Sequence, residues 1–411
     1  MTHPATYPTS LEAPPVDLRA ATRATYITFI TAGVAMSSWA SRIPQIRDAL
    51  HLNPSRLGLV LLSIAAGSLT SLVASGHIVA RFGSRRTVGA MAFLLMVALS
   101  IAASGYHLGV APVVVGLYLF GFGGGAWDVA MNVQGADVER GLNRSIMSRF
   151  HAGFSVGTVG GALVGAGAVA AHVPVTLHLT VAAVAVGVST MWAVRDYLPD
   201  APQEPAPAEG GGLRHTLRFW REPRTLLIGL FVLAFAFAEG TGVDWINVAL
   251  IDDYDAPAAV GTLGFALFLA AMTTGRWFGP GLLDRYGRVP VNRAIAVLGI
   301  GGLLLFIFGG VTPVAFAGAL LWGLGASLGF PVGMSAASDD PKYAAPRVSV
   351  VASIGYCAFL GGPPLIGFLG DHVTVSRALF ATVALLGIAT LIAGSVREPK
   401  RSPAPDPAPA P

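Results

Sequence analysis

The stretch LGLVLLSIAAGSLTSLVASGHIVARFGSRRTVGAMAFLLMVALSIAASG, residues 57–105, decides the fold of this chain. Two apolar runs, residues 57–79 and 87–105, lie on either side of a short basic loop. Each run is close to the roughly 20 residues that an α-helix needs to cross the hydrocarbon core of a bilayer. The stretch therefore predicts two transmembrane helices joined by a tight turn.

The rest of the chain repeats this pattern of apolar runs and short polar joints. Hydrophobic residues make up 54% of the 411 residues and charged residues 12%, whereas a soluble domain has about 25% charged residues. The composition predicts an all-α polytopic membrane protein embedded in a lipid bilayer. Twelve transmembrane helices are expected, at residues 24–43, 55–79, 87–104, 109–134, 147–170, 174–193, 226–250, 258–282, 290–310, 313–337, 346–370 and 374–395.

A polar segment rich in Pro, Ala and Gly divides the twelve spans into two sets of six. It covers residues 194–225 and is predicted to be a cytoplasmic linker. On either side of it, residues 24–193 and 226–396 are expected to form an N-terminal and a C-terminal six-helix bundle. Residues 1–23 are interpreted as a cytoplasmic N-terminal tail, and the low-complexity residues 397–411 as a disordered C-terminal tail.

Short sequence landmarks recur in the two halves. Residues 81–83 (RFG) align with residues 285–287 (RYG) at an offset of 204, and residues 121–123 (GFG) align with residues 323–325 (GLG) at an offset of 202. Two landmarks at nearly one offset predict that the bundles are pseudo-symmetric copies.

The distribution of basic residues predicts the orientation in the membrane. With the N-terminus inside, twenty of the 26 Lys and Arg residues fall in cytoplasmic segments, as the positive-inside rule requires. We therefore expect a multi-pass protein of the plasma membrane with both termini in the cytoplasm.

Several other classes of function find no support in the sequence. It contains no nucleotide-binding loop, catalytic triad or metal-ligand cluster, and its single cysteine, Cys357, lies in an apolar run. No basic run interleaved with aromatic residues lies in an exposed domain, as a nucleic-acid-binding surface would require. We therefore expect no enzyme activity, no cofactor, no metal and no nucleic-acid partner.

The loops GHIVARFGSRR (residues 76–86) and PGLLDRYGRVP (residues 280–290) place basic residues around a glycine at the end of a span. The glycine permits a tight turn with positive φ, and the basic side chains can pair with carboxylates or with helix C-termini. These loops resemble the signature G-x-x-x-D-R-x-G-R-R of the major facilitator superfamily. The resemblance covers the whole chain, because the twelve spans and the long central linker also agree with it.

This resemblance implies a cytoplasmic gate between the two bundles. The first copy of the loop has Ala80 in place of the acid, and the second has Pro280 in place of the first glycine, so we expect the gate to use Asp284, or Asp137 and Glu139. The alternative is that the basic loops only fix topology, and the two roles are compatible. The gate candidates are Arg81, Gly83, Arg85, Asp284, Arg285, Gly287 and Arg288.

Polar residues inside the fourth and fifth spans form the first candidate site. Charged side chains in a membrane span are costly and by default suggest function. Asp128 is expected at a depth similar to that of Arg149 and His151, and Asn132, one helical turn from Asp128, shares its face. Asp128, Arg149 and His151 are candidates for proton coupling, but a structural ion pair between Asp128 and Arg149 is an equally good interpretation.

The seventh span carries a second polar group. Glu239 is expected near the middle of the membrane and has no basic partner at its depth in its own span, so it is a further proton-coupling candidate. Asp244 and Asn247 share one face closer to the outside. Glycines in this span would loosen the helix, as a moving element requires.

The pattern Trp127-Asp128-x-x-x-Asn132 resembles the fucose-permease-like branch of the superfamily, in which the acid of the fourth span takes part in substrate binding and proton coupling. That branch also uses an acid in the first span, where this chain has Trp39 and Arg42. Tryptophans can stack on a sugar ring, although they also serve as interfacial anchors. The substrate-binding candidates are Trp39, Trp127, Asn132, Asp244, Trp245 and Asn247.

These observations predict a secondary active transporter of a small solute, driven by protons and working by alternating access. Import of a sugar-like solute is one possibility within this class, and a drug or metabolite efflux antiporter is the other. A membrane sensor without transport is the alternative from another class. The expected partners are the bilayer, a small-molecule substrate and protons, and the expected state is a monomer.

Overall fold

The computed structural model describes residues 17–144, 146–200, 218–340 and 342–398. Every regular element within these ranges is a helix. Residues 201–217 of the predicted linker, 1–16 of the predicted N-terminal tail and 399–411 of the predicted C-terminal tail lie outside the described residues. The expected disorder of the C-terminal tail is therefore not tested.

The helices follow one another in two groups. The first group is α1 (Leu18–Ala40), α2 (Ile43–Ala49), α3 (Pro54–Gly105), α4 (Val110–Leu142), α5 (Met147–Ala170), α6 (Val175–Ala193) and η1 (Val194–Asp196). The second group is α8 (Pro223–Tyr254), α9 (Ala258–Tyr286), α10 (Arg288–Phe308), α11 (Thr312–Ala326), α12 (Gly329–Ala337), α13 (Ala344–His372), α14 (Val375–Ala378), α15 (Phe380–Ile392) and η2 (Ala393–Val396).

Ten helical stretches of the described chain are long and apolar enough to cross a membrane. One of them, α3, contains 52 residues and bends at Gly83, so it comprises two of the predicted spans. The 23-residue α1 is not among the ten. Counting α1 and both arms of α3, the architecture is consistent with the twelve spans that the sequence predicts.

Sequence signals at the helix starts explain where several helices begin. Asp17 caps α1 by accepting hydrogen bonds from the backbone N–H groups of Arg19 and Ala20. Asn53 caps α3 in the same way, and Pro54 occupies the first position, where a missing N–H costs nothing. Three boundaries differ most from the prediction. The helix α1 begins at residue 18 rather than 24, inside the predicted N-terminal tail, and α4 runs eight residues past its expected end at residue 134. A break at Ser327 and Leu328 separates α11 from α12.

The turn at Gly83 recurs at Gly287. The φ and ψ angles are 78° and 165° at Gly83 and 80° and 164° at Gly287, a region that is open essentially to glycine alone. A carboxylate that follows the last helix of each half meets the next N–H group: Asp200 accepts from Ser84 N at 2.6 Å, and Glu398 accepts from Arg288 N at 3.3 Å. The two copies of the repeat thus share one backbone conformation.

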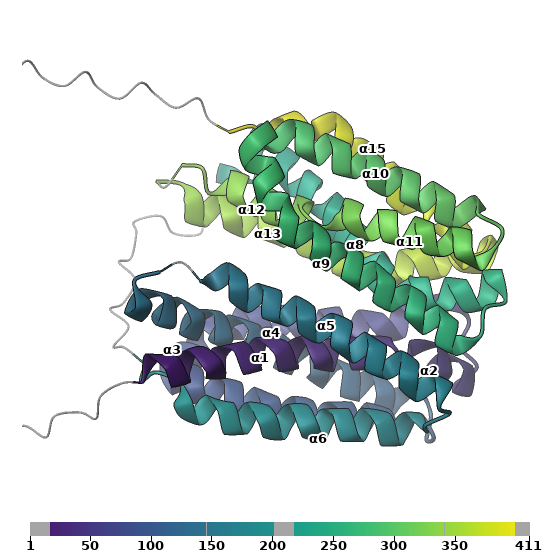
Figure 1. Cartoon of the computed structure of the whole chain (residues 1–411), viewed down its shortest axis with the longest axis horizontal. Coiled ribbons are helices and arrows are strands. Elements are labelled where there is room, and N and C mark those ends of the chain that lie inside the picture. Colours follow the sequence, from purple (N-terminus) through teal and green to yellow (C-terminus); the bar gives the residue numbers. More distant parts are fainter. Residues whose placement is uncertain (1–16, 145, 201–217, 341, 399–411) are drawn as a thin grey trace, which may run out of the picture.

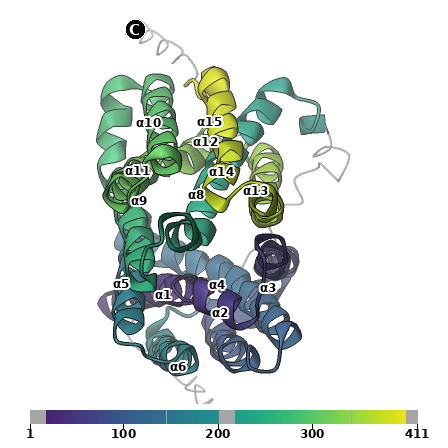
Figure 2. The same ribbon diagram turned by 90° about the vertical axis from the view of Figure 1, so that its right-hand side faces the viewer.

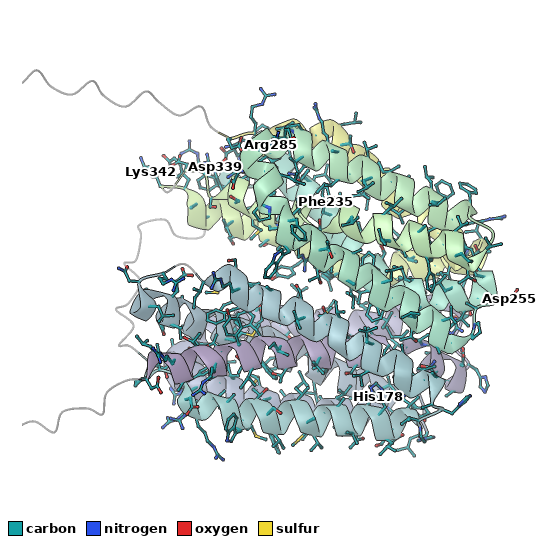
Figure 3. All side chains as sticks on the ribbon, viewed as in Figure 1. His178, Phe235, Asp255, Arg285, Asp339 and Lys342 are labelled. Carbon is teal, nitrogen blue, oxygen red and sulfur yellow. The ribbon has the colours of Figure 1, made fainter. Side chains whose placement is uncertain are left out.

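The two groups of helices form two bundles, one above the other in Figure 1. Both described chain ends and the Gly83 and Gly287 turns lie at one end of the bundles, which we call the terminal side. The opposite end, with α2 and the start of α9, is the distal side. Figure 3 shows Arg285 and Asp339 at the terminal side and Asp255 at the distal side.

The bundles approach each other most closely at the distal side and diverge toward the terminal side (Figure 1). Figure 2 shows α13 above α3 on one flank and α9 above α5 on the other, in agreement with the packing of these pairs. Near the distal end, α3 and α13 touch through glycines: a Cβ added at Gly58 would meet the carbonyl oxygen of Pro363, and one added at Gly367 would meet that of Pro54. The absence of side chains at these glycines permits the contact.

Candidate functional site

Polar contacts between the bundles lie at the distal side. Arg47 of α2 forms an ion pair with Asp252 at the end of α8, with Nη2 and Oδ1 2.9 Å apart. The backbone N–H of Ser55 donates to Asp371 Oδ2 at 3.3 Å. Within the described ranges, no ion pair joins the bundles at the terminal side. The distal side is therefore closed in this conformation, and the terminal side is not held shut by charge.

Asp128 occupies the inner part of α4 and faces the second bundle. Its carboxylate is exposed to solvent, and its charge acts on the phenol of Tyr356 in α13. Asn132 Nδ2 donates to the backbone oxygen of Asp128 at 2.8 Å and to Oδ1 at 3.3 Å, as the one-turn spacing predicts. Because Asp128 is exposed while it faces the opposite bundle, solvent reaches it between the bundles.

The expected common depth of Asp128, Arg149 and His151 is wrong. Gly135 of α4 lies against Met147 and Phe150 of α5, where an added Cβ would be 3.1 and 3.4 Å from their side chains. Asp128 precedes Gly135 by seven residues, so it lies about 10 Å farther from the terminal side than Gly135, Met147 and Phe150. The error follows from the length of α4, which continues two turns beyond its predicted end.

The alternative interpretation of an Asp128–Arg149 ion pair is also wrong. Both side chains are exposed, and no hydrogen bond or ion pair joins them in the described chain. Asp128 has Asn132 as a neutral hydrogen-bonding partner. Its carboxylate is thus free of a cationic partner among the described residues and can bind and release a proton.

Glu239 has a basic partner on a neighbouring helix. Arg276 Nη2 of α9 donates to Glu239 Oε2 at 2.7 Å, and Arg276 Nε donates to the carbonyl oxygen of Ser327 at 3.3 Å. Ser327 lies at the break between α11 and α12, where a carbonyl group lacks its usual helical partner. Arg276 therefore links the break to Glu239. The sequence placed Arg276 within a span but gave no sign of this break.

His151 lies at the start of α5, nearer to the terminal side. Its ring meets Phe29 of α1 edge to face, with centroids 5.1 Å apart. Arg276 of the second bundle is close enough for its positive charge to act on His151, so both residues lie at the interface between the bundles. The sequence did not predict that Arg276 and His151 lie at one interface.

The expected substrate-stacking tryptophans are enclosed in this conformation. Trp39, Trp127 and Trp245 are 4%, 1% and 0% exposed, and none of their indole N–H groups has a partner among the described residues. Asn247 is also buried: its Nδ2 donates to Thr262 Oγ1 at 3.2 Å and to the carbonyl oxygen of Ser41 at 3.5 Å, so it belongs to the closed distal side. Asp244 is half-buried.

The gate candidates make contacts within their own bundles. Arg81 lies over the ring of Phe82 and Arg285 over that of Tyr286, at 5.7 and 5.2 Å from the ring centroids. Arg288 Nη1 donates to Asp339 Oδ1 at 2.7 Å. Among the described contacts, none joins Arg85, Asp284 or another gate candidate to the opposite bundle. The predicted gate is therefore not assembled in this conformation, and its role stays a prediction.

Comparison with known proteins connects this arrangement to a family. The sequence model of the Major Facilitator Superfamily matches residues 25–361. An uncharacterized transporter of Sinorhizobium fredii is 31% identical over 372 residues, which cover 90% of this chain and 96% of that protein. An uncharacterized MFS-type transporter of Yersinia pestis is 32% identical over 372 residues, with coverage of 88% and 92%.

Solved structures agree with the fold. A bacterial homolog of the human lysosomal transporter Spinster, in an inward-facing and unoccupied conformation, matches with a TM-score of 0.76 at 13% identity, covering 95% of this chain and 100% of that one. The fucose:proton symporter of Escherichia coli matches with a TM-score of 0.66 at 14% identity, covering 92% and 98%. At these identities the likeness concerns the fold alone.

Proposed function

Because this chain belongs to the major facilitator superfamily and is a multi-pass membrane transporter, we propose that it moves a small polar solute by alternating access and couples that movement to protons through Asp128. Its relatives are transporters rather than enzymes. The proposal assigns proton binding to Asp128, whose carboxylate lies between the two bundles.

The single observation that carries the proposal is the state of Asp128. It is a solvent-exposed carboxylate inside a membrane-spanning helix, it faces the opposite bundle, and it has a neutral amide as its hydrogen-bonding partner. A carboxylate without a cationic partner binds a proton more readily once water is removed from around it. Closing the terminal side over Asp128 would remove its water and so link protonation to conformation.

Glu239 has a different role in this proposal. Its ion pair with Arg276 is already neutral overall, so neither group needs a proton to be enclosed. The pair presents both a donor and an acceptor to the interface opposite His151. We assign it to solute binding and to holding the α11–α12 break in place, and we assign the proton to Asp128.

The closed distal side supports alternating access. In this conformation the Arg47–Asp252 ion pair and the α3–α13 contact join the bundles at one end only. With the orientation expected from the basic residues, this is an inward-facing state with both termini in the cytoplasm of the cell. The proposal includes a plasma-membrane location, two six-helix units and a monomer as the working form.

A polyol or sugar-like solute fits the groups that face the interface. Asn132, Tyr356 and the Glu239–Arg276 pair offer hydrogen-bond donors and acceptors without a net charge. The similarity in fold to the fucose:proton symporter is compatible with this substrate class. A hydrophobic drug would leave these polar groups without partners, which costs binding free energy.

The test is transport in proteoliposomes with an imposed pH gradient. The solute is first identified by its stabilisation of the purified protein against heat. A gradient of one pH unit with one proton per solute concentrates the solute up to about tenfold. We expect wild type and the control Asp255→Asn, an exposed acid directly after α8, to concentrate it.

Asp128→Asn is expected to exchange labelled for unlabelled solute and to lose concentration against a gradient. If Asp128→Asn still concentrates the solute, the proposed coupling is wrong. Proton-driven export of the solute from the vesicles would instead favour an efflux antiporter, and stabilisation without any flux would favour a sensor.

A further inference from the structure

A buried hydrogen bond at the distal side takes no part in the site described above. Arg42 lies between α1 and α2, and its Nε donates to Nδ1 of His178 in α6 at 2.9 Å. The two residues are 2% and 7% exposed. Figure 3 shows His178 on α6 in the distal half of the first bundle, and it is the fourth residue of that helix.

This hydrogen bond fixes the protonation state of His178. Because Nδ1 accepts from a guanidinium, it carries no hydrogen, and the neutral ring carries its proton on Nε2. A proton added to Nδ1 would turn the acceptor into a donor and place a second positive charge against Arg42. The Arg42–His178 bond therefore exists only while His178 is neutral.

Within the described part of the chain, no carboxylate forms an ion pair with Arg42 or His178. Arg42 is the charged group that acts on His178, and Tyr106 after α3 acts on Arg42. From α5, Gly165 lies near the ring: its added Cβ would be 3.8 Å from Cε1 of His178. Among the described residues, Arg42 Nη2 and His178 Nε2 are buried without hydrogen-bonding partners. Unsatisfied buried donors lower the stability of the state that contains them. The closed state is therefore less stable than one in which these two N–H groups have hydrogen-bonding partners.

The bond connects directly to the closure of the distal side. Arg42 is the residue before α2, and its carbonyl oxygen accepts from Ile46 N at 3.2 Å. The same short helix carries Arg47, which pairs with Asp252 of the second bundle. Holding Arg42 against α6 thus holds α2 in the position from which Arg47 reaches across.

We propose that His178 is a second proton-binding site, and that its protonation breaks the Arg42–His178 hydrogen bond and releases α2 so that the distal side opens. One proton binds to Nδ1, and no covalent bond changes. By linkage, the state with an open distal side binds this proton more tightly than the closed state. With the orientation expected from the sequence, acid outside the cell favours the outward-open state. The inference rests on the alternating access of the proposed function and is independent of Asp128.

The test measures the distal distance directly. Ala49 on α2 and Ala259 on α9 are changed to cysteine in a Cys357→Ala background, labelled with nitroxides, and measured by pulsed electron resonance in lipid nanodiscs from pH 8 to pH 5. In the otherwise native protein we expect the open fraction to rise about threefold or more as the pH falls.

Two variants separate the proton from the hydrogen bond. His178→Gln keeps an acceptor for Arg42 and cannot be charged, so it is expected to stay closed at every pH. Arg42→Met removes the donor, so it is expected to be more open at pH 8 with little further change. The control His172→Asn, at an exposed loop residue with φ of 54°, is expected to behave like wild type, since Asn tolerates this conformation.

The outcomes separate this inference from the proposed function. An unchanged pH response in His178→Gln, or none in wild type, overturns the inference. If the open fraction of the distal side in wild type does not change with pH while wild type still concentrates the solute, the inference about His178 is wrong and the proposed function stands. If neither wild type nor any variant concentrates the solute, proton coupling through Asp128 is wrong. If the distal side of Asp128→Asn still opens as the pH falls, the inference about His178 is supported in that case as well.

Discussion

Charged residues inside the helices of this transporter are of two kinds. Glu239 and Arg276 are paired, with Nη2 and Oε2 2.7 Å apart, whereas Asp128 has only an amide partner. A paired group is stabilised in one charge state, and an unpaired carboxylate can change its charge at lower cost. This difference is why we assign structure and solute binding to the first pair and proton transfer to Asp128.

The first prediction concerns the Glu239–Arg276 pair. Glu239→Gln and Arg276→Gln each leave a charge without its partner, and each is expected to lower the stability of the folded protein by about 1.5–3 kcal/mol. The double variant should cost clearly less than the sum, because it leaves no unpaired charge. Thermal unfolding in one detergent measures all four proteins, and strictly additive losses would contradict the pairing.

The second prediction concerns pH and Glu222 at the start of α8. Its hydrogen bonds from Arg347, at 2.9 and 2.6 Å, hold the pKa of the Glu222 carboxyl below its ordinary value of 4.5, and one from Thr225 acts in the same direction. A lowered pKa in the folded state contributes stability above the unfolded pKa, and this contribution is lost as the pH falls through the folded pKa.

We therefore expect wild type to unfold at a higher temperature than Glu222→Gln at pH 7, and the difference to shrink below pH 4.5. Thermal unfolding from pH 7 to pH 3.5 measures this, with Asp255→Asn as a control at an exposed position. A difference that stays constant, or grows, on acidification would show that the Glu222 charge does not stabilise the fold.

At the residue scale, the sequence identified the charged candidates but not all of their partners. The spacing of Asp128 and Asn132 predicted their contact, because four residues span one helical turn. The Glu239–Arg276 pair could not be predicted, because it depends on how α8 and α9 pack. The Arg42–His178 bond was missed for the same reason: it joins positions 136 residues apart, and neither residue has a local motif.

At the scale of helices, the contact of α3 with α13 depends on glycines. The prediction of apolar spans was accurate for most helices, because the length of each apolar run follows directly from the sequence. The end of α4 was not predicted, because residues 135–142 carry three charged side chains and yet continue the helix beyond the apolar run. That extension separates Asp128 from Arg149 and His151 in depth.

A third prediction follows from Gly58. A Cβ there would collide with the carbonyl oxygen of Pro363, so Gly58→Ala is expected to prevent close approach of α3 and α13 and to shift the protein toward a state with an open distal side. The Ala49–Ala259 distance described above reports this. Gly76→Ala in the same helix is the matched control, because an added Cβ there meets nothing within 4 Å. Equal distances in both variants would contradict a role for this contact.

At the scale of the whole molecule, the two bundles are joined at one end. Arg47–Asp252 is the ion pair that crosses between them in the described chain. The side chains of Arg47 and Asp252 are 9% and 32% exposed, so the pair is partly shielded from water. The fold and its pseudo-symmetry were predictable from the repeated loops. Which side is closed in this conformation could not be predicted, because one sequence specifies both the inward-open and the outward-open state of a transporter.

The fourth prediction tests this closure. Asp252→Arg places two cations together and is expected to raise the open fraction of the distal side about 5- to 30-fold, a change of one to two kcal/mol. Adding Arg47→Asp should restore closure by reversing the pair. Asp255→Asn serves as the control. Failure of the double variant to recover the closed distance would mean that the pair does not hold the distal side shut.

The central claim is that solute and protons move together through Asp128. The most direct measurement is proton movement across the membrane of proteoliposomes that contain a pH-sensitive dye, when solute is added without an imposed gradient. We predict that wild type shows solute-dependent proton uptake, and that Asp128→Asn equilibrates the solute with no proton movement. Solute-dependent proton uptake of equal size in Asp128→Asn, or its absence from wild type that transports the solute, would contradict the claim.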